Sequence, residues 1–380
     1  LQSTIIARTT ATTQPGIYHI GQSEYSVPAG ARPINFQHKI ANSDDRPALG
    51  SARPGASESA RPDASFQQTL RNRISCTGVG LHSGVDVAMT LMPADPDTGI
   101  VFRRTDVDTS HLDRDIAEIP ALWNHVSGTM LGTTLVNDHG TSVATVEHLM
   151  AALAGCGVDN AIVELNGGEV PIMDGSSAPF VFLIECAGIF EQNQVRRAIR
   201  VLKPVTVSDK GRTVTLRPAE RFTLSVDIDF DSPVVAHQTC EFDEASMTFK
   251  DELCRARTFG FLHEVSALQD KGLARGGSLD NAVVVDGDRV MNEDGLRFAD
   301  EFARHKALDA VGDLYLAGGR LLARYEGEKA GHEMNNRVLR ALFADASAWE
   351  WCDDIQADVR AGVEASGQEE WVEERAVAMA

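Results

Sequence analysis

The sequence lacks three features that would assign it to familiar classes. Its six cysteines include no CxxC pair, so neither a cysteine-rich zinc finger nor a disulfide framework is predicted. No run of about 20 apolar residues is present, which argues against a membrane-spanning helix, and the first residues lack the apolar stretch of a signal peptide. The formal net charge of -20 is opposite to that of nucleic-acid-binding proteins. We therefore expect a cytoplasmic protein with no nucleic-acid partner.

A length of 380 residues, of which 43% are apolar, suits two compact domains with additional segments. Residues 1–68 are rich in Pro, Ala, Gly and Ser without periodic apolar positions, which predicts a disordered extension. Residues 353–380 carry clustered acidic side chains and are predicted to form a solvated acidic tail. Between these segments we predict a first domain over 69–193 and a second over 194–352.

Strand-like and helix-like patterns alternate in both predicted domains. Apolar and polar residues alternate over 85–92 and again over 222–228, which predicts half-buried strands. Helical spacing of apolar residues predicts helices over 143–153 and 301–316. We therefore predict an α+β fold with two similar domains, in which helices pack against or between β-sheets.

One helix pattern occurs in both halves of the chain. Glu147 and His148 lie near the start of a predicted helix that Gly155 closes, and His305 lies near the start of one that Gly318 closes. Each helix has a histidine near its start and a glycine at its end. Two domains of similar plan that face one another would account for this similarity.

His305 and Asp309 are four residues apart on the second of these helices. Side chains at this spacing lie one turn apart on one face, so both can reach a single ion. Zinc binds histidine nitrogen and aspartate oxygen, and a catalytic site typically has three protein ligands and an open position. His148 is our candidate for the third ligand. An isolated His-Asp pair, however, is more often an ordinary helix-surface pair.

Glu147 precedes His148, and adjacent helical residues diverge. Glu147 would therefore not share the ion, but it could take a proton from a metal-bound water, as the glutamate of HExxH metalloproteases does. The alternative is that both residues form the exposed first turn of a helix. Lys306 could contact an anionic substrate, or it could be an ordinary surface lysine.

His332 lies in a glycine-containing loop before the last predicted helix. Such a loop suits a general acid that protonates a leaving amine. Asp313, one further turn along the Asp309 face, could orient His332 and keep it cationic. A capping or surface histidine is an equally good interpretation of His332 from the sequence alone.

Seven stretches between Leu70 and Trp351 together resemble the UDP-3-O-acyl-N-acetylglucosamine deacetylases, which commit the lipid A pathway of Gram-negative bacteria. They occur in the order found in that family. The stretches are Thr77–His82, Ser142–Leu153, Pro171–Phe180, Arg255–Phe261, Asn292–Phe298, Glu301–Asp309 and Gly331–His332.

The resemblance implies roles for eight residues and a two-domain fold with the metal at the domain junction. It implies that Zn²⁺ is bound by His148, His305 and Asp309. It also implies roles for five further residues: Glu147 as general base, His332 as general acid, Asp313 as support for His332, Thr258 as the group that polarises the acetyl carbonyl, and Lys306 as a substrate contact.

The resemblance further implies a hydrophobic passage for the acyl chain. Among the positions that match this passage, the small side chains of Ala274, Ser278 and Ala282 suit a tube that leaves room for an acyl chain, although small residues also simply permit close packing. Ala274 replaces a cysteine found in some members, and Gly132 is likewise small, so the preferred chain length is left open. The matching positions are Phe259, Phe261, Val265, Ala274, Ser278, Ala282 and Val284.

The expected reaction is hydrolysis of the 2-N-acetyl group of UDP-3-O-acyl-N-acetylglucosamine, with release of acetate. The expected partner is thus a UDP-linked acylated glucosamine. Because this substrate carries a lipid, we expect transient contact with the cytoplasmic face of the inner membrane, and we expect a monomer. Two alternatives remain: a zinc amidohydrolase that acts on another N-acyl sugar, and a non-catalytic nucleotide-sugar-binding protein.

Overall fold

The computed structural model describes residues 16–20, 23–27, 65–109 and 114–354. Among these residues, no helix is long and apolar enough to cross a membrane. The predicted acidic tail lies almost wholly outside the described residues, as does most of the predicted N-terminal extension. The proposed domain limits therefore stay predictions.

The first half of the chain forms one large sheet. In spatial order its strands are β1 (Gly16–Ile20), β2 (Ser23–Val27), β4 (Ile74–Val79), β5 (Asp86–Pro93), β11 (Ala161–Leu165), β6 (Ile100–Arg104) and β7 (Glu118–Pro120). Neighbouring strands are antiparallel except for β11 and β6. Strand β5 alternates between buried and more exposed side chains, so Val87, Met89 and Leu91 all face the core.

Two small sheets and two α-helices complete this half. The small sheets are β8 (Val126–Gly128), β9 (Thr134–Val136) and β10 (Ser142–Val143), and β3 (Phe66–Leu70) with β12 (Ile189–Val195). The 3-10 helices are η1 (Arg114–Ile116) and η2 (Trp123–His125), and the α-helices are α1 (Glu147–Gly155) and α2 (Ala178–Ala187). Helices α1 and α2 pack against each other, and α2 also contacts β4.

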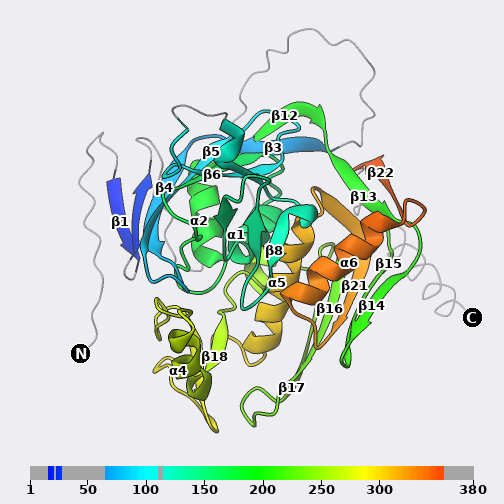
Figure 1. Ribbon diagram of the computed structural model, residues 1–380. Helices are drawn as coiled ribbons and strands as arrows, with labels where there is room; N and C mark the ends of the chain where they lie inside the picture. Colours follow the sequence, from blue (N-terminus) through cyan, green and yellow to red (C-terminus); the bar gives the residue numbers. More distant parts are fainter. Residues whose placement is uncertain (1–15, 21–22, 28–64, 110–113, 355–380) are drawn as a thin grey trace, which may run out of the picture.

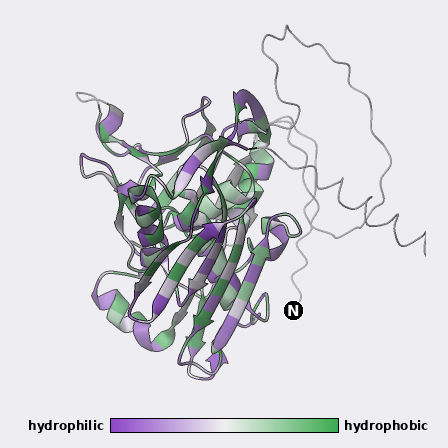
Figure 2. Ribbon diagram, turned by 90° about the vertical axis from the view of Figure 1, so that its right-hand side faces the viewer, coloured by the Kyte–Doolittle hydropathy of each residue, from purple (hydrophilic) through white to green (hydrophobic). Residues whose placement is uncertain are grey.

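The second half forms another large sheet around a long strand, β21 (Arg320–Glu328). This strand is antiparallel to β15 and parallel to β13 and β16. Buried and less buried residues alternate along β16. Figure 2 shows hydrophobic and hydrophilic residues alternating along strands of this half. The other strands are β13 (Arg197–Val201), β14 (Val205–Asp209), β15 (Arg212–Pro218), β16 (Thr223–Asp229), β17 (His237–Asp243) and β22 (Trp349–Asp353).

Helices α1, α2, α5 (Glu301–Tyr315) and α6 (His332–Ala344) lie between the two large sheets (Figure 1). Helices α5 and α6 pack on the second sheet, and α5 also packs along α1 of the first half. Buried apolar side chains of both halves form one continuous cluster. The predicted α+β class, with helices packed between sheets, is confirmed.

A smaller lobe lies at one end of the molecule (Figure 1). It contains the sheet of β18 (Phe259–Phe261), β19 (Val283–Asp286) and β20 (Arg289–Val290), together with α4 (Leu262–Asp270). No residue of α4 is fully buried. The short helix α3 (Phe249–Glu252) precedes this lobe in the sequence.

Away from the start of α6, the structure differs from the predicted elements in two places. The helix predicted over 143–153 begins at Glu147, because Ser142 and Val143 form strand β10 and Thr145 has a left-handed backbone with φ 58°. Strands β1 and β2 lie within the segment predicted to be disordered. They extend the first sheet at its edge through β4, and main-chain pairing of this kind requires no periodic apolar residues.

Candidate metal centre and active site

The site forms where the first turn of α1 meets the middle of α5. Gly312 permits this approach, because a Cβ atom on it would overlap the carbonyl oxygen of Glu147. Asp309 and Asp313 lie on the face of α5 that carries His305, at successive four-residue spacings. Two segments from different halves of the chain are thus joined by close helix packing.

The three predicted ligands His148, His305 and Asp309 form one buried cluster. Their candidate ligand atoms all lie within 4.8 Å of one another. Asp309 Oδ1 is 3.3 Å from His305 Nε2 and 3.6 Å from His148 Nε2. Tetrahedral zinc with bonds of about 2.0–2.1 Å separates its ligand atoms by about 3.3–3.4 Å. The spacing of these side chains therefore fits a metal ion of this kind.

One carboxylate oxygen of the cluster, Asp309 Oδ1, is buried and has no hydrogen-bond partner among the described residues. A buried carboxylate oxygen without a donor is costly, and a cation between it and the two imidazole rings would remove that cost. The structure therefore supports a metal-binding cluster at these three residues.

The backbone around Ala256 fixes the ring of His305. His305 Nδ1 lies 3.0 Å from the carbonyl oxygen of Ala256, so Nδ1 carries the proton and Nε2 is left to bind a metal. Burial lowers the pKa of His305 to about 3, although Asp309 opposes this shift. A neutral imidazole is the form that binds a metal.

A buried ion pair holds the Ala256 segment against the start of α5. Arg257 donates from its backbone N–H and from Nε to Glu301 Oε1, at 3.0 and 2.9 Å. The N–H of Arg297 donates to the other carboxylate oxygen at 2.6 Å. Burial would raise the pKa of Glu301, but the Arg257 bonds bring it below its usual value. The segment that orients His305 is thus anchored by a charged contact.

Glu147 is buried beside the metal cluster, so it does not form an exposed helix turn. Its Oε2 accepts the backbone N–H of Thr133 at 2.9 Å. A Cβ atom on Gly132 would lie 3.0 Å from Oε1, so the glycine leaves this oxygen accessible. Burial raises the pKa of Glu147, although the nearby His332 and His148 oppose the shift. A carboxylate with a raised pKa suits a general base.

His332 was predicted to lie in the loop before the last helix, but it is the first residue of α6, with Gly331 as the N-cap. It points into the same site. Its Nδ1 is 2.8 Å from Asp313 Oδ2, and its Nε2 is 3.9 Å from both Glu147 Oε1 and Asp309 Oδ2. Burial alone would lower the pKa of His332, but the three carboxylates raise it to about 9. The ring is therefore cationic at neutral pH, as a proton donor must be.

Three polar residues of the site were not predicted from the sequence. Asp313 accepts hydrogen bonds from the Thr133 hydroxyl at 2.6 Å and from the Asn335 amide at 2.9 Å. Asn335 in turn accepts from the Tyr325 hydroxyl at 2.6 Å. Asn335 follows His332 by three residues on α6, and this spacing was the one available signal. Thr133 and Tyr325 have the sequence pattern of ordinary strand residues.

Lys306 and the predicted substrate residues flank the cluster on the side of the small lobe. Lys306 Nζ is 3.0 Å from Asp309 Oδ2 and 5.6 Å from the ring centroid of Phe259. The backbone N–H of Thr258 donates to the Gly175 carbonyl oxygen at 2.8 Å. This bond fixes the backbone at Thr258. Thr258 follows Ala256, whose carbonyl oxygen orients the His305 ring, by two residues.

The positions predicted to line an acyl passage gather in the small lobe. Phe259 lies on β18, with its ring centroid 6.4 Å from that of His305. Strand β18 pairs with β19, and α4 packs on both strands. The remaining positions are Phe261 on β18, Val265 on α4, Val284 on β19, and Ala274, Ser278 and Ala282 in the connection between α4 and β19.

The sequence matches a family model described as "LpxC: UDP-3-O-acyl N-acetylglycosamine deacetylase" over residues 67–344. The chain belongs to this family. It is similar to the UDP-3-O-acyl-N-acetylglucosamine deacetylase of Saccharophagus degradans, with 52% identity over 75% of this chain and 92% of the relative. The enzyme of that name from Chromobacterium violaceum is 52% identical over 75% and 93%. The one from Marinobacter nauticus is 53% identical over 75% and 92%.

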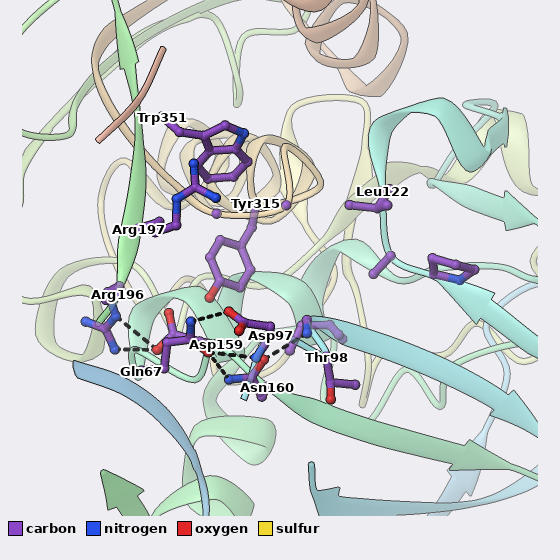
Figure 3. A pocket seen from close by; sticks show the side chains of 16 residues that line it. Gln67, Asp97, Thr98, Leu122, Asp159, Asn160, Arg196, Arg197, Tyr315 and Trp351 are labelled. Atoms are coloured by element: carbon purple, nitrogen blue, oxygen red, sulfur yellow. Dashed lines mark hydrogen bonds and ion pairs between the residues drawn. The ribbon is translucent and has the colours of Figure 1, made fainter. Parts of the chain in front are cut away.

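A separate pocket of about 290 Å³ lies beside Tyr315, at the C-terminal end of α5 (Figure 3). Arg197 covers the ring of Trp351 at 4.8 Å, and Arg196 pairs with Asp159 at 2.7 Å. None of the site residues predicted from the sequence lines this pocket. Several of its polar side chains are hydrogen-bonded to one another, as Gln67 is to Asp97 and Asn160.

Proposed function

We propose that this chain hydrolyses the 2-N-acetyl group of UDP-3-O-acyl-N-acetylglucosamine and releases acetate, the committed step of lipid A biosynthesis. One observation carries the proposal most strongly. In a member of this deacetylase family, a buried His-His-Asp cluster lies beside a buried glutamate that is not one of the clustered residues, and beside a histidine whose pKa is raised to about 9. That arrangement supplies a metal site, a base and an acid, the three functions that amide hydrolysis requires.

The metal proposed is Zn²⁺, held by His148, His305 and Asp309. Two nitrogens and one oxygen are a common donor set for catalytic zinc, which leaves a fourth position open. When bound, zinc would lower the pKa of a water molecule to about 7 and polarise the acetyl carbonyl. The chain's own residues perform the proton transfers.

Glu147 is the proposed general base that removes the proton from the attacking water. Its Oε2 is occupied by the Thr133 N–H, which leaves Oε1 to accept the proton. His332, held by Asp313, is the proposed general acid, and its Nε2 proton passes to the amine nitrogen as the C–N bond breaks. Glu147 Oε1 and His332 Nε2 are 3.9 Å apart, so the two can reach the attacking oxygen and the leaving nitrogen of one tetrahedral centre.

Thr258 and Lys306 are proposed to act on the substrate's oxygens. The hydroxyl of Thr258 would donate to the acetyl carbonyl and stabilise the charge that develops there. Burial lowers the pKa of Lys306, but Asp309 and other carboxylates bring it above its usual value. Lys306 is therefore a fixed cation, suited to an anionic part of the substrate.

The small lobe is the proposed binding place of the 3-O-acyl chain. Phe259 and Phe261 provide half-buried aromatic walls, and no residue of α4 is fully buried, so apolar surface is available to a ligand. The lining positions Val265, Ala274, Ser278, Ala282 and Val284 complete the proposed passage. We further propose a cytoplasmic monomer that contacts the inner membrane transiently to reach its lipid-bearing substrate.

The test is acetate release from the 3-O-acylated UDP-sugar and from unacylated UDP-N-acetylglucosamine. We expect release from the acylated substrate, loss of activity with a chelator, and recovery with zinc. Equal efficiency on the unacylated sugar would favour an amidohydrolase of other N-acyl sugars. Binding of both sugars without any acetate release would favour a non-catalytic binding protein.

A further inference from the structure

Thr133 contacts the proposed base and the residue that holds the proposed acid. Its backbone N–H donates to Glu147 Oε2 at 2.9 Å, and its hydroxyl donates to Asp313 Oδ1 at 2.6 Å. Thr133 is 1% exposed, and both carboxylates are 3% exposed or less. Water therefore cannot easily replace either bond. A single residue thus fixes two carboxylates that face the reaction from different helices.

Asp313 is held from three sides. Thr133 binds one carboxylate oxygen, and the other accepts from His332 Nδ1 at 2.8 Å and from Asn335 Nδ2 at 2.9 Å. These donors come from a loop before β9 and from two positions of α6. With both oxygens engaged, the carboxylate cannot rotate about its Cβ–Cγ bond without losing buried hydrogen bonds.

The Asn335 side-chain amide is itself oriented by a hydrogen bond from Tyr325. Tyr325 donates its hydroxyl to Asn335 Oδ1 at 2.6 Å, which turns the NH₂ group toward Asp313. Tyr325 is fully buried. A Cβ atom on Gly327 would lie 2.6 Å from the tyrosine hydroxyl, so glycine at this position leaves the space in which the hydroxyl lies. The chain of contacts runs from β21 through α6 to the base on α1.

We propose that Thr133 is a positioning residue that sets the relative orientation of base and acid, with Asn335 and Tyr325 completing the support of Asp313. This inference rests on the proposed function, because it assigns Glu147 and His332 to the two proton transfers. The hydrogen bonds that the Thr133 N–H and hydroxyl donate run to Glu147 and Asp313, and none runs to His148, His305 or Asp309 among the described residues. Its hydroxyl acts on His332 through Asp313, and its N–H acts on Glu147 directly.

The substitution Thr133→Val tests the role of the hydroxyl alone, because it removes that group and little else. Valine has nearly the same shape and keeps the backbone N–H, so the bond to Glu147 is retained. Asp313 Oδ1 then loses its donor, and the carboxylate is held through Oδ2 alone, so its orientation toward His332 is less tightly fixed. We expect kcat to fall about 10–100-fold, the range typical of residues that orient a catalytic group through another, with KM unchanged.

Thr69→Val is the matched control. Thr69 is also buried, and its hydroxyl donates to the Asn160 carbonyl oxygen at 2.7 Å and accepts the Ala94 N–H at 3.0 Å, with no bond to a residue of the metal cluster. The control should lose at least as much stability as Thr133→Val, without a change in kcat. Thr133→Ser, which restores the hydroxyl, should recover most of the activity. An equal loss of kcat in both valine variants, or no recovery in Thr133→Ser, would overturn the proposal.

A double-variant cycle tests whether the hydroxyl acts through His332. In a His332→Ala background, Thr133→Val should lower kcat by less than about twofold, because the group it positions is gone. A full-sized loss in that background would show that Thr133 acts elsewhere.

Tyr325→Phe removes the hydroxyl that orients Asn335, which also supports Asp313, and it should likewise lower kcat. Tyr315→Phe, which removes a hydroxyl bound to the Val158 carbonyl, is its control.

A spectroscopic measurement separates this inference from the proposed function. In protein with ¹⁵N-labelled histidine, the Nδ1–H of His332 should give a slowly exchanging, low-field resonance because it donates to Asp313. Thr133→Val should broaden or shift it, and Thr69→Val should not. If the wild type releases no acetate, the proposed function fails, while this resonance still decides the positioning role. An unchanged resonance in Thr133→Val overturns that role, whatever the activity.

Discussion

Gly312 of α5 lies directly against the backbone carbonyl of Glu147 at the first turn of α1, with no room for a side chain between them. The contact joins the helix that carries Glu147 and His148 to the helix that carries His305 and Asp309. The geometry of the metal cluster therefore depends on a residue that has no side chain.

Replacing Gly312 by alanine should disrupt the cluster. The added Cβ would overlap the Glu147 carbonyl oxygen, so α1 would have to move away from α5, at a cost of about 1–3 kcal/mol of stability. We expect zinc affinity to fall at least about 10-fold, as measured by competition with a chelator. Gly155→Ala is the control, because its Cβ would overlap Phe249 at the other end of α1. Equal zinc affinity in the two variants would contradict this account.

The Arg257–Glu301 pair should contribute strongly to stability. Both side chains are buried, at 8% and 0% exposure, and removal of one partner leaves the other charge uncompensated. We expect Arg257→Met to lower the free energy of unfolding by about 3–5 kcal/mol in urea titrations. Arg217→Met, which breaks an exposed pair with Glu326, should cost no more than about 1 kcal/mol. Similar losses in both variants would refute the structural role of the buried pair.

If His148, His305 and Asp309 bind zinc as proposed, zinc should stabilise the folded protein through these three residues. A ligand that binds only the native state adds about 2.7 kcal/mol when its free concentration is 100 times its Kd. We expect the melting temperature of the metal-free protein to rise with added zinc, and that of His305→Ala to rise far less. A shift of equal size in both proteins would mean that zinc binds elsewhere.

His332 should titrate well above an ordinary histidine in the metal-free protein. Burial opposes its charge, but Asp313, Glu147 and Asp309 bring its pKa from 6.5 to about 9. A raised native pKa stabilises the fold fully below pH 6.5, and that stabilisation is lost as pH rises through about 9. Asp313→Asn should lower the pKa of His332. Titration of the histidine resonances by NMR checks both, and a wild-type value at or below 6.5 would contradict the electrostatic account.

Much of the site could be predicted from the sequence because its helical part follows a regular period. The four-residue spacing of His305 and Asp309 placed both on one face, and the structure brings them together with His148. The α+β class followed from alternating strand and helix patterns. The start of α1 was less regular, because β10 and the left-handed Thr145 precede it.

The rest of the site depends on contacts between segments that are distant in the sequence. Thr133 has the pattern of an ordinary strand residue, and only the packed structure brings its hydroxyl to Asp313. Tyr325 likewise lies in the part of β21 where buried and less buried residues alternate. Its hydrogen bond to Asn335 forms only because α6 packs on that sheet. Gly312 has no helix-ending role, so its contact with α1 leaves no signal in a single sequence.

The most direct test of the account is the metal content and acetate release of Glu147→Ala. Glu147 is not among the three clustered ligands, so this variant should bind as much zinc as the wild type. Because it lacks the base, its acetate release should fall at least about 100-fold. Loss of zinc would instead place Glu147 among the ligands, and full activity with zinc still bound would contradict its role as the base.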